Sequence, residues 1–155
     1  MGLDSLSLLL HLESEFDLTI RDEDTVRLCT VGQLYRYLLQ RHGLHHPWPC
    51  PTVAVHRRLL QWLGSRHLHP RQDWWKLSAE TGWPLPPVHN GLPYSCRTPA
   101  HLARAITLLQ DDETHPQSPR VAIWRRLRAA LALHFNLHPH QLYPHQHLIH
   151  DLGLD

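Results

Sequence analysis

Ser5 is a candidate nucleophile in this chain of 155 residues. It follows Asp4 at the start of an apolar helical pattern, so the sequence predicts a serine in the first turn of a helix. There, unpaired backbone N–H groups and the positive end of the helix dipole favour a phosphate group. Asp4 is the candidate N-cap, and Gly2, or Gly153 near the other end of the chain, allows a tight turn before it. The Ser5 hydroxyl is therefore expected where a phosphate group is favoured.

The two ends of the chain share one short sequence. The chain begins Met-Gly-Leu-Asp-Ser-Leu and ends His-Asp-Leu-Gly-Leu-Asp. When the two Gly-Leu-Asp triplets are overlaid, the joined ends read Asp-Leu-Gly-Leu-Asp-Ser-Leu. This string resembles the phosphopantetheine-attachment motif of acyl carrier proteins, opened at the modification site.

The resemblance continues on both sides of the junction, over residues 1–44 and 120–155. Three front segments are similar to the end of helix II, the short acidic helix III and the start of helix IV: residues 12–20, 22–24 and 30–34. Three back segments resemble helix I and the loop that leads to the serine: residues 121–135, 137–139 and 151–153. The order on both sides is that of the family.

The resemblance implies a carrier that is not itself an enzyme. A phosphopantetheinyl transferase would move 4′-phosphopantetheine from coenzyme A onto Ser5. Asp4 would be one of the ligands of the Mg²⁺ ion in this reaction, and Leu6 completes the motif. The thiol of the arm would then carry an acyl group to partner synthases or acyltransferases, as in fatty acid or polyketide biosynthesis. Five residues separate Leu6 from Leu12, fewer than in the family. This shortening favours the alternative, an unmodified carrier-like module that binds a protein partner.

Acidic residues dominate the first 24 positions, where seven acids accompany one base, Arg21. In carrier proteins, acidic helices II and III dock on basic surfaces of enzymes. A local negative field also steers a basic partner. The alternative is an ordinary solvated helix face. The candidate partner-binding residues are Glu13, Glu15, Asp17, Asp22 and Glu23.

Helical periodicity dominates the chain, and no alternating strand pattern of useful length appears, so we expect an all-α fold. Thr30 and Gln33 form a capping-box signature, and Ser118 with Pro119 is typical of a helix start. Each apolar stripe is one-sided, which predicts that the helices pack against one another in a bundle. The expected faces are Leu9, Leu12, Phe16, Leu34 and Leu38 at the front and Val121, Trp124, Leu127, Leu131 and Phe135 at the back.

The middle of the chain repeats parts of its ends. Residues 53–59 match residues 121–127 at five of seven positions, and Leu-His-Pro occurs at both 68–70 and 137–139. We therefore expect a second, degenerate carrier-like bundle that is shortened and has lost the serine. It should span residues 52–112, with a helix stub over 73–83, a loop over 84–93, and linkers at 45–51 and 113–119.

The segments 1–44 and 120–155 can complete one bundle in two ways. They meet within one chain, as in a circular permutation, or between chains, as in a swapped homodimer. The cost of closing a loop grows only logarithmically with its length, so we expect closure within the chain.

The composition narrows the class of partner and the location. A net charge of +1 with neutral histidines argues against a nucleic-acid or membrane partner. Three cysteines without a C-x-x-C pair indicate reduced thiols, and no apolar run approaches ~20 residues, so we expect a cytoplasmic protein. The 16 histidines lack the spacing of metal ligands, so we expect no metal site. A histidine-rich metal-binding protein is the third interpretation, after the carrier and the unmodified module.

Overall fold

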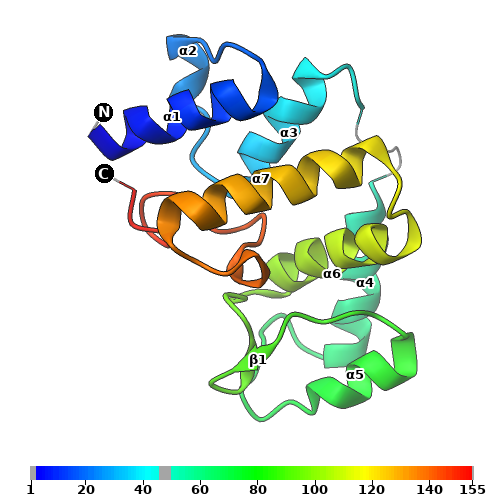
Figure 1. Cartoon of the computed structure of the whole chain (residues 1–155). Coiled ribbons are helices and arrows are strands. Elements are labelled where there is room, and N and C mark those ends of the chain that lie inside the picture. The colour runs from blue at the N-terminus through cyan, green and yellow to red at the C-terminus, as the bar shows by residue number, and fades with distance from the viewer. Residues whose placement is uncertain (1–2, 46–49, 155) are drawn as a thin grey trace. The chain divides into compact units, whose positions relative to one another are not determined.

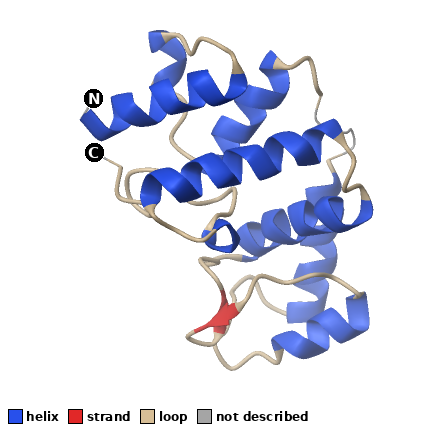
Figure 2. Cartoon of the chain, in the orientation of Figure 1, coloured by secondary structure: helices blue, strands red, loops and turns tan. Residues whose placement is uncertain are grey.

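The computed structural model describes residues 3–45 and 50–154, and helices make up most of them (Figures 1 and 2). The chain divides into two units. The end unit contains residues 1–46 and 117–155, and the middle unit contains residues 47–116. The predicted all-α class is confirmed, with one small β-hairpin in the middle unit as the exception.

The end unit is built around one long helix. Its elements are α1 (Leu3–Phe16), α2 (Asp22–Thr25), α3 (Val31–Arg41), α7 (Pro119–Phe135) and the 3₁₀ turn η1 (Pro139–Gln141). Helix α7 packs against both α1 and α3. Tyr35 of α3 meets Trp124 of α7 edge to face at 5.3 Å between ring centroids, and its hydroxyl donates to the Arg120 carbonyl at 3.1 Å.

The predicted helix starts are confirmed. The Thr30 hydroxyl accepts from the Gln33 amide at 3.2 Å, while the Gln33 side chain accepts from the Thr30 amide at 2.9 Å. Ser118 is the N-cap of α7, and Pro119 is its first residue. Each of these signals is local, because it depends on residues within one turn of the helix end.

Two expectations about the buried faces are wrong. Helix α1 buries Leu8 where the sequence suggested Leu9, which is only half-buried. Helix α7 is not one-sided, because Ile123, Arg128 and Ala130 are buried together with most of the predicted stripe. Phe135, the last residue of that stripe, is half-buried.

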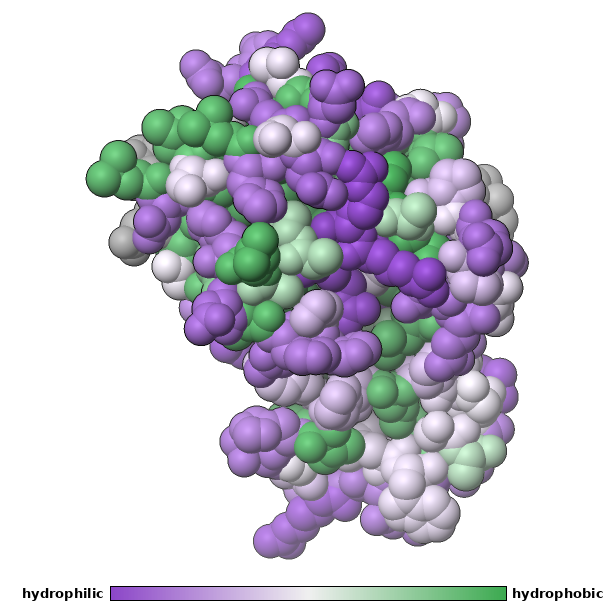
Figure 3. Space-filling view, viewed as in Figure 1, coloured by the Kyte–Doolittle hydropathy of each residue, from purple (hydrophilic) through white to green (hydrophobic). Residues whose placement is uncertain are grey.

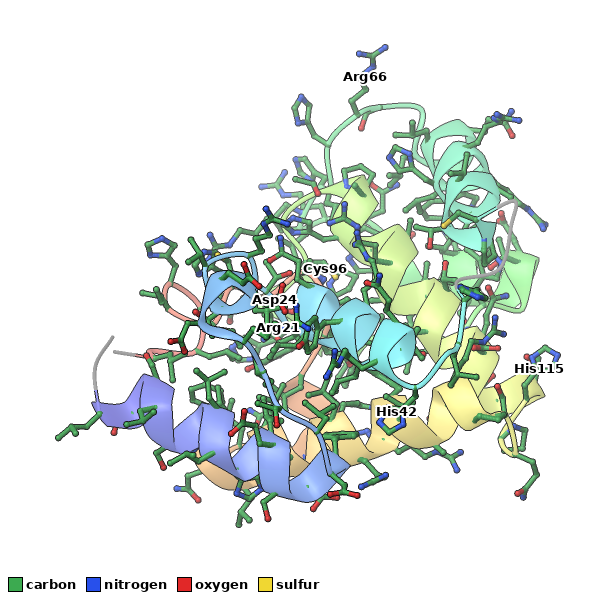
Figure 4. The ribbon with its side chains drawn as sticks, turned by 90° about the horizontal axis from the view of Figure 1, so that it is seen from above. Arg21, Asp24, His42, Arg66, Cys96 and His115 are labelled. Atoms are coloured by element: carbon green, nitrogen blue, oxygen red, sulfur yellow. The ribbon has the colours of Figure 1, made fainter. Side chains whose placement is uncertain are left out.

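The segment after α7 returns to the start of α3. The Gly32 amide donates to the Pro144 carbonyl at 2.8 Å, and the Leu148 amide donates to the Cys29 carbonyl at 2.8 Å. A Cβ at position 32 would lie 2.8 Å from the Pro144 carbonyl oxygen, so only glycine permits this approach. The segment then runs toward the beginning of α1, and both views show it ending there (Figures 1 and 4).

The middle unit contains α4 (Pro51–Leu63), α5 (Trp74–Thr81), β1 (Val88–His89), β2 (Leu92–Pro93) and α6 (Pro99–Thr114). Helices α4 and α6 pack together. The residues buried on them are Val55 and Leu59 in α4 and Pro99, Leu102, Ala103, Ala105 and Ile106 in α6. Helix α5 is the predicted stub.

The loop predicted over residues 84–93 contains the antiparallel hairpin of β1 and β2, which is a correction. Asn90 and Gly91 both have positive φ, at 51° and 80°, as a tight hairpin turn requires. The Trp74 indole donates to the Gly91 carbonyl at 2.7 Å and holds this turn. The Asn-Gly pair was the sequence signal for the hairpin.

The linkers are also shorter than predicted. Pro51 already begins α4, and α6 continues through residues 113 and 114. The expected linker 45–51 includes residues 46–49, which lie outside the described residues.

The same turn occurs in both units at the repeated Leu-His-Pro sequence. The His69 ring nitrogen Nδ1 accepts from the Arg71 amide at 3.1 Å, and His138 Nδ1 accepts from the His140 amide at 3.3 Å. The N-cap of α6 likewise repeats that of α3, because the Thr98 hydroxyl accepts from the His101 amide at 3.2 Å.

Candidate functional site

Ser5 lies in the first turn of α1, as its third residue. The prediction that Asp4 is the N-cap is wrong. An N-cap residue has non-helical backbone angles, whereas α1 already begins at Leu3 and Asp4 is its second residue. Gly2, one of the two glycines expected to turn the chain, and Asp155 of the joined motif lie outside the described residues. Gly153, the other candidate, has a φ of 78°, as a tight turn requires.

The surroundings of Ser5 combine helix-end polarity with apolar neighbours. The first N–H groups of a helix have no acceptor within it, and the helix dipole adds partial positive charge there. Ser5 is half-buried, whereas Leu3 is 86% exposed and Leu6 is 48% exposed. A phosphodiester on the Ser5 hydroxyl therefore fits the electrostatics of this turn.

An apolar row lies beside Ser5 on the exposed side of α1. It consists of Leu3, Leu6 and Leu10, which are three and four residues apart, and Leu10 is 57% exposed. The space-filling view shows apolar side chains gathered at this end of α1 (Figure 3). This row was not predicted, because Leu8, Leu9 and Leu10 are consecutive leucines and offer three possible helix faces.

The five predicted partner-binding acids do not form one uniform surface. Glu13 Oε1 accepts from the Ile20 amide at 2.7 Å and so fastens the segment after α1. Glu15 pairs with Arg126 of α7 at 3.2 Å between Oε1 and Nε, and its carbonyl also accepts from that guanidinium. Asp17, Asp22 and Glu23 are exposed, and Glu23 keeps this exposure although it pairs with Arg21 at 3.6 Å.

Asp17 has a structural reason for its place in the sequence. It follows the last residue of α1 with a φ of 50°, in the left-handed region where a helix commonly ends. Asp and Asn tolerate this conformation better than most residues. Gly82 has a φ of 70° directly after α5, so both helices end in the same way.

The structure brings together a second group of polar residues that the sequence did not indicate. A hollow of about 240 Å³ lies beside α3 and is lined by Arg27, Leu28, Gln33, Arg36, Tyr37 and Gln40. Four of these residues share one face of α3, at spacings of three and four. Arg27 and Leu28 come from the segment after α2, so the hollow depends on tertiary structure.

Two pairs of histidine rings lie against each other in the segment after α7. The rings of His138 and His140 stack at 4.9 Å, and those of His147 and His150 lie 4.4 Å apart. Within residues 3–45 and 50–154, no group of three or more His, Cys, Asp or Glu residues is placed to hold a metal ion.

Comparison of the chain with protein-family models, with curated proteins and with solved structures gave no match. Among the described residues, none of the helices combines the length and apolar character needed to span a bilayer.

Proposed function

We propose that the end unit is a carrier domain that bears 4′-phosphopantetheine on Ser5. The supporting observation is the order of its elements. When the chain ends are joined, α7, the segment 136–154, α1, α2 and α3 follow the order helix I, loop, helix II, helix III and helix IV of acyl carrier proteins. Ser5 then lies in the first turn after the long loop.

The residues of α1 have separate roles in this proposal. The Ser5 hydroxyl accepts the phosphopantetheine group, and the exposed carboxylate of Asp4 lies next to it in the same turn. Leu3 and Leu6 provide apolar contact beside the attachment point. When bound, the arm supplies the thiol that carries an acyl group as a thioester.

Fewer acids are available to a partner than the number of acids in the sequence implied, because some of them hold the end unit together. Glu13 and Glu15 stabilise the end unit, so we assign partner binding mainly to Asp17, Asp22 and Glu23. A basic enzyme surface is the complementary partner.

The middle unit fits a second copy of the carrier fold that lost its serine segment. The shared His-capped turn and the shared Thr cap support the duplication. The ends of α1 and α5 also correspond. Each helix is followed by a residue with positive φ, Asp17 or Gly82, and the residue five positions earlier, Leu12 or Leu77, is fully buried. No Asp-Ser-Leu occurs in residues 47–116, so we expect one arm per chain.

Intact-mass measurement tests the carrier proposal. Incubation with coenzyme A and a permissive phosphopantetheinyl transferase should add one phosphopantetheine per chain. Ser5→Ala should abolish the addition, whereas Ser7→Ala, which changes an exposed serine on the same helix, should not. Circular dichroism should show equal helical content in both variants.

The second candidate is an unmodified module that binds a protein through α1. The exposed row Leu3, Leu6 and Leu10 favours it, because an apolar helix face is a common protein-binding surface. A chain that stays unmodified while an ordinary carrier protein is fully converted would select this candidate.

A further inference from the structure

The hollow beside α3 is separate from the Ser5 turn and contains a second set of chemical groups. Two arginines enter it from different parts of the end unit, Arg27 after α2 and Arg36 on α3. Within the described residues, neither guanidinium has a hydrogen-bond or ion-pair partner in the protein. Both groups are therefore available to a ligand.

Tyr37 supplies a polar atom that the protein satisfies poorly. Its hydroxyl oxygen is covered from solvent and has no hydrogen-bond partner of ordinary distance and angle within the described residues, although the Asp24 carboxylate lies near it. A buried polar group without a partner costs free energy, and a ligand that accepts a hydrogen bond removes that cost. Burial raises the pKa of the Tyr37 phenol above its ordinary value, so the group stays protonated and remains a donor.

The charges near Tyr37 are mixed, and Arg21 among them pairs with Glu23 at 3.6 Å. The Asp24 carboxylate raises the Tyr37 pKa through its charge and by attracting the phenol proton, so a ligand has to compete with Asp24 for that proton. Arg41 acts in the opposite direction from 6.0 Å above the ring. Arg21 also contributes positive charge, and it lies beside Asp24 at α2 (Figure 4). The lining itself contains two arginines and no carboxylate.

The lining determines the class of ligand. Guanidinium groups, a phenol O–H and the amide groups of Gln33 and Gln40 provide many donors, while Leu28 adds a small apolar surface. Guanidinium binds phosphate through two parallel hydrogen bonds and remains charged at all physiological pH values. We propose that this hollow binds a phosphate group through Arg27, Arg36 and the Tyr37 hydroxyl.

The experiment titrates the full chain with two probes, inorganic phosphate and phenyl phosphate, at constant ionic strength. Two-dimensional ¹H–¹⁵N NMR should show saturable shifts for the amides of Arg27, Gln33, Arg36 and Tyr37. Tighter binding of phenyl phosphate would indicate a phosphate monoester as the ligand, and equal binding would indicate free phosphate. Chloride at the same ionic strength should leave these amides unmoved.

Three variants assign the binding. Arg27→Gln and Arg36→Gln should each weaken binding about tenfold or more, because each removes a charge-assisted contact. Tyr37→Phe should weaken it several-fold. Arg57→Gln, which changes an exposed arginine of α4, is the matched control and should bind like the original chain.

The outcomes separate this proposal from the carrier proposal. Ser5→Ala should bind phosphate normally, because Ser5 does not line the hollow. The phosphate proposal is overturned if the amides around the hollow do not shift saturably, or if Arg27→Gln and Arg36→Gln bind with unchanged affinity.

Discussion

Single side chains of the end unit have roles that their charge does not reveal. Glu13 and Glu15 contribute to an acidic sequence, yet one carboxylate holds the backbone after α1 and the other holds α7. Arg126 also lies over the Phe16 ring at 4.7 Å, so it combines an ion pair with a cation–π contact. A charge count from the sequence therefore overstates the acidic surface open to a partner.

The burial of Cys96 predicts that its thiol reacts slowly in the folded protein. Cys96 is 2% exposed, and burial raises the pKa of its thiol to about 12. The thiolate is the reactive form, so folded protein should resist iodoacetamide at Cys96 while the half-buried Cys29 and Cys50 react. Peptide mass spectrometry at pH 8 checks this, with urea-unfolded protein as the control in which all three cysteines react. Rapid labelling of Cys96 in the folded protein would contradict its burial.

The same thiol affects stability at alkaline pH. The folded state keeps the proton up to about pH 12, whereas an unfolded cysteine loses it near its ordinary value of 9.0. Above that value the unfolded state binds fewer protons, so the free energy of unfolding should fall as the pH rises. Cys96→Ala should reduce this loss in urea titrations between pH 8 and pH 10.5.

At the scale of the elements, local signals were the predictable ones. Thr30 with Gln33 and Ser118 with Pro119 fixed two helix starts, because a cap involves residues close in sequence. The buried side of α1 was not predictable, since three consecutive leucines do not distinguish Leu8 from Leu9. The hollow was missed for another reason: Arg27 and Arg36 meet only after the segment following α2 packs beside α3.

The His-capped turn after α7 should contribute to the stability of the end unit. His138 Nδ1 accepts a hydrogen bond from the His140 amide at 3.3 Å, and so it caps the turn. His138→Ala should lower the free energy of unfolding of the end unit by roughly 0.5–2 kcal/mol, while His138→Asn, which also caps, should cost less. Chemical denaturation at pH 7.5, with NMR signals from α3 and α7, measures the difference.

Other contacts also hold this turn. Arg128 of α7 donates from Nε to the Pro139 carbonyl at 2.9 Å, and the His140 ring stacks on that of His138. Equal stability of the original chain and His138→Ala would contradict a role for the cap.

At the scale of the whole molecule, the end unit requires both ends of the described chain. Trp124, Leu127 and Leu131 of α7 are buried in a unit where α7 packs on α1 and α3. The repeat between the units suggested this division from the sequence, since it separated residues 52–112 from both flanks. The middle unit is formed from consecutive residues, and so its stability should not depend on residues 117–155.

Deletion of residues 117–155 tests this dependence. Residues 3–45 should unfold because α1 and α3 lose the helix that covers them, while α4 and α6 should remain helical. Hydrogen exchange with mass spectrometry locates the loss, and persistent protection over residues 5–40 would refute a shared bundle. Leu127→Ala is the milder version. Leu127 is fully buried, so the substitution should cost about 2–5 kcal/mol.

The distance along the chain between partners in the end unit also sets the order in which the protein can form during synthesis. The Tyr35 hydroxyl bonds to a residue 85 positions later, and Glu15 pairs with one 111 positions later. Ribosomes add ~5–20 residues per second, so the first helices wait on the order of 10 s for α7. During that interval the middle unit is made and can begin to fold, while the leucines of α1 and α3 remain uncovered and open to chaperones. Helices α1 and α3 are therefore made before the middle unit, yet they reach their final packing after it can fold.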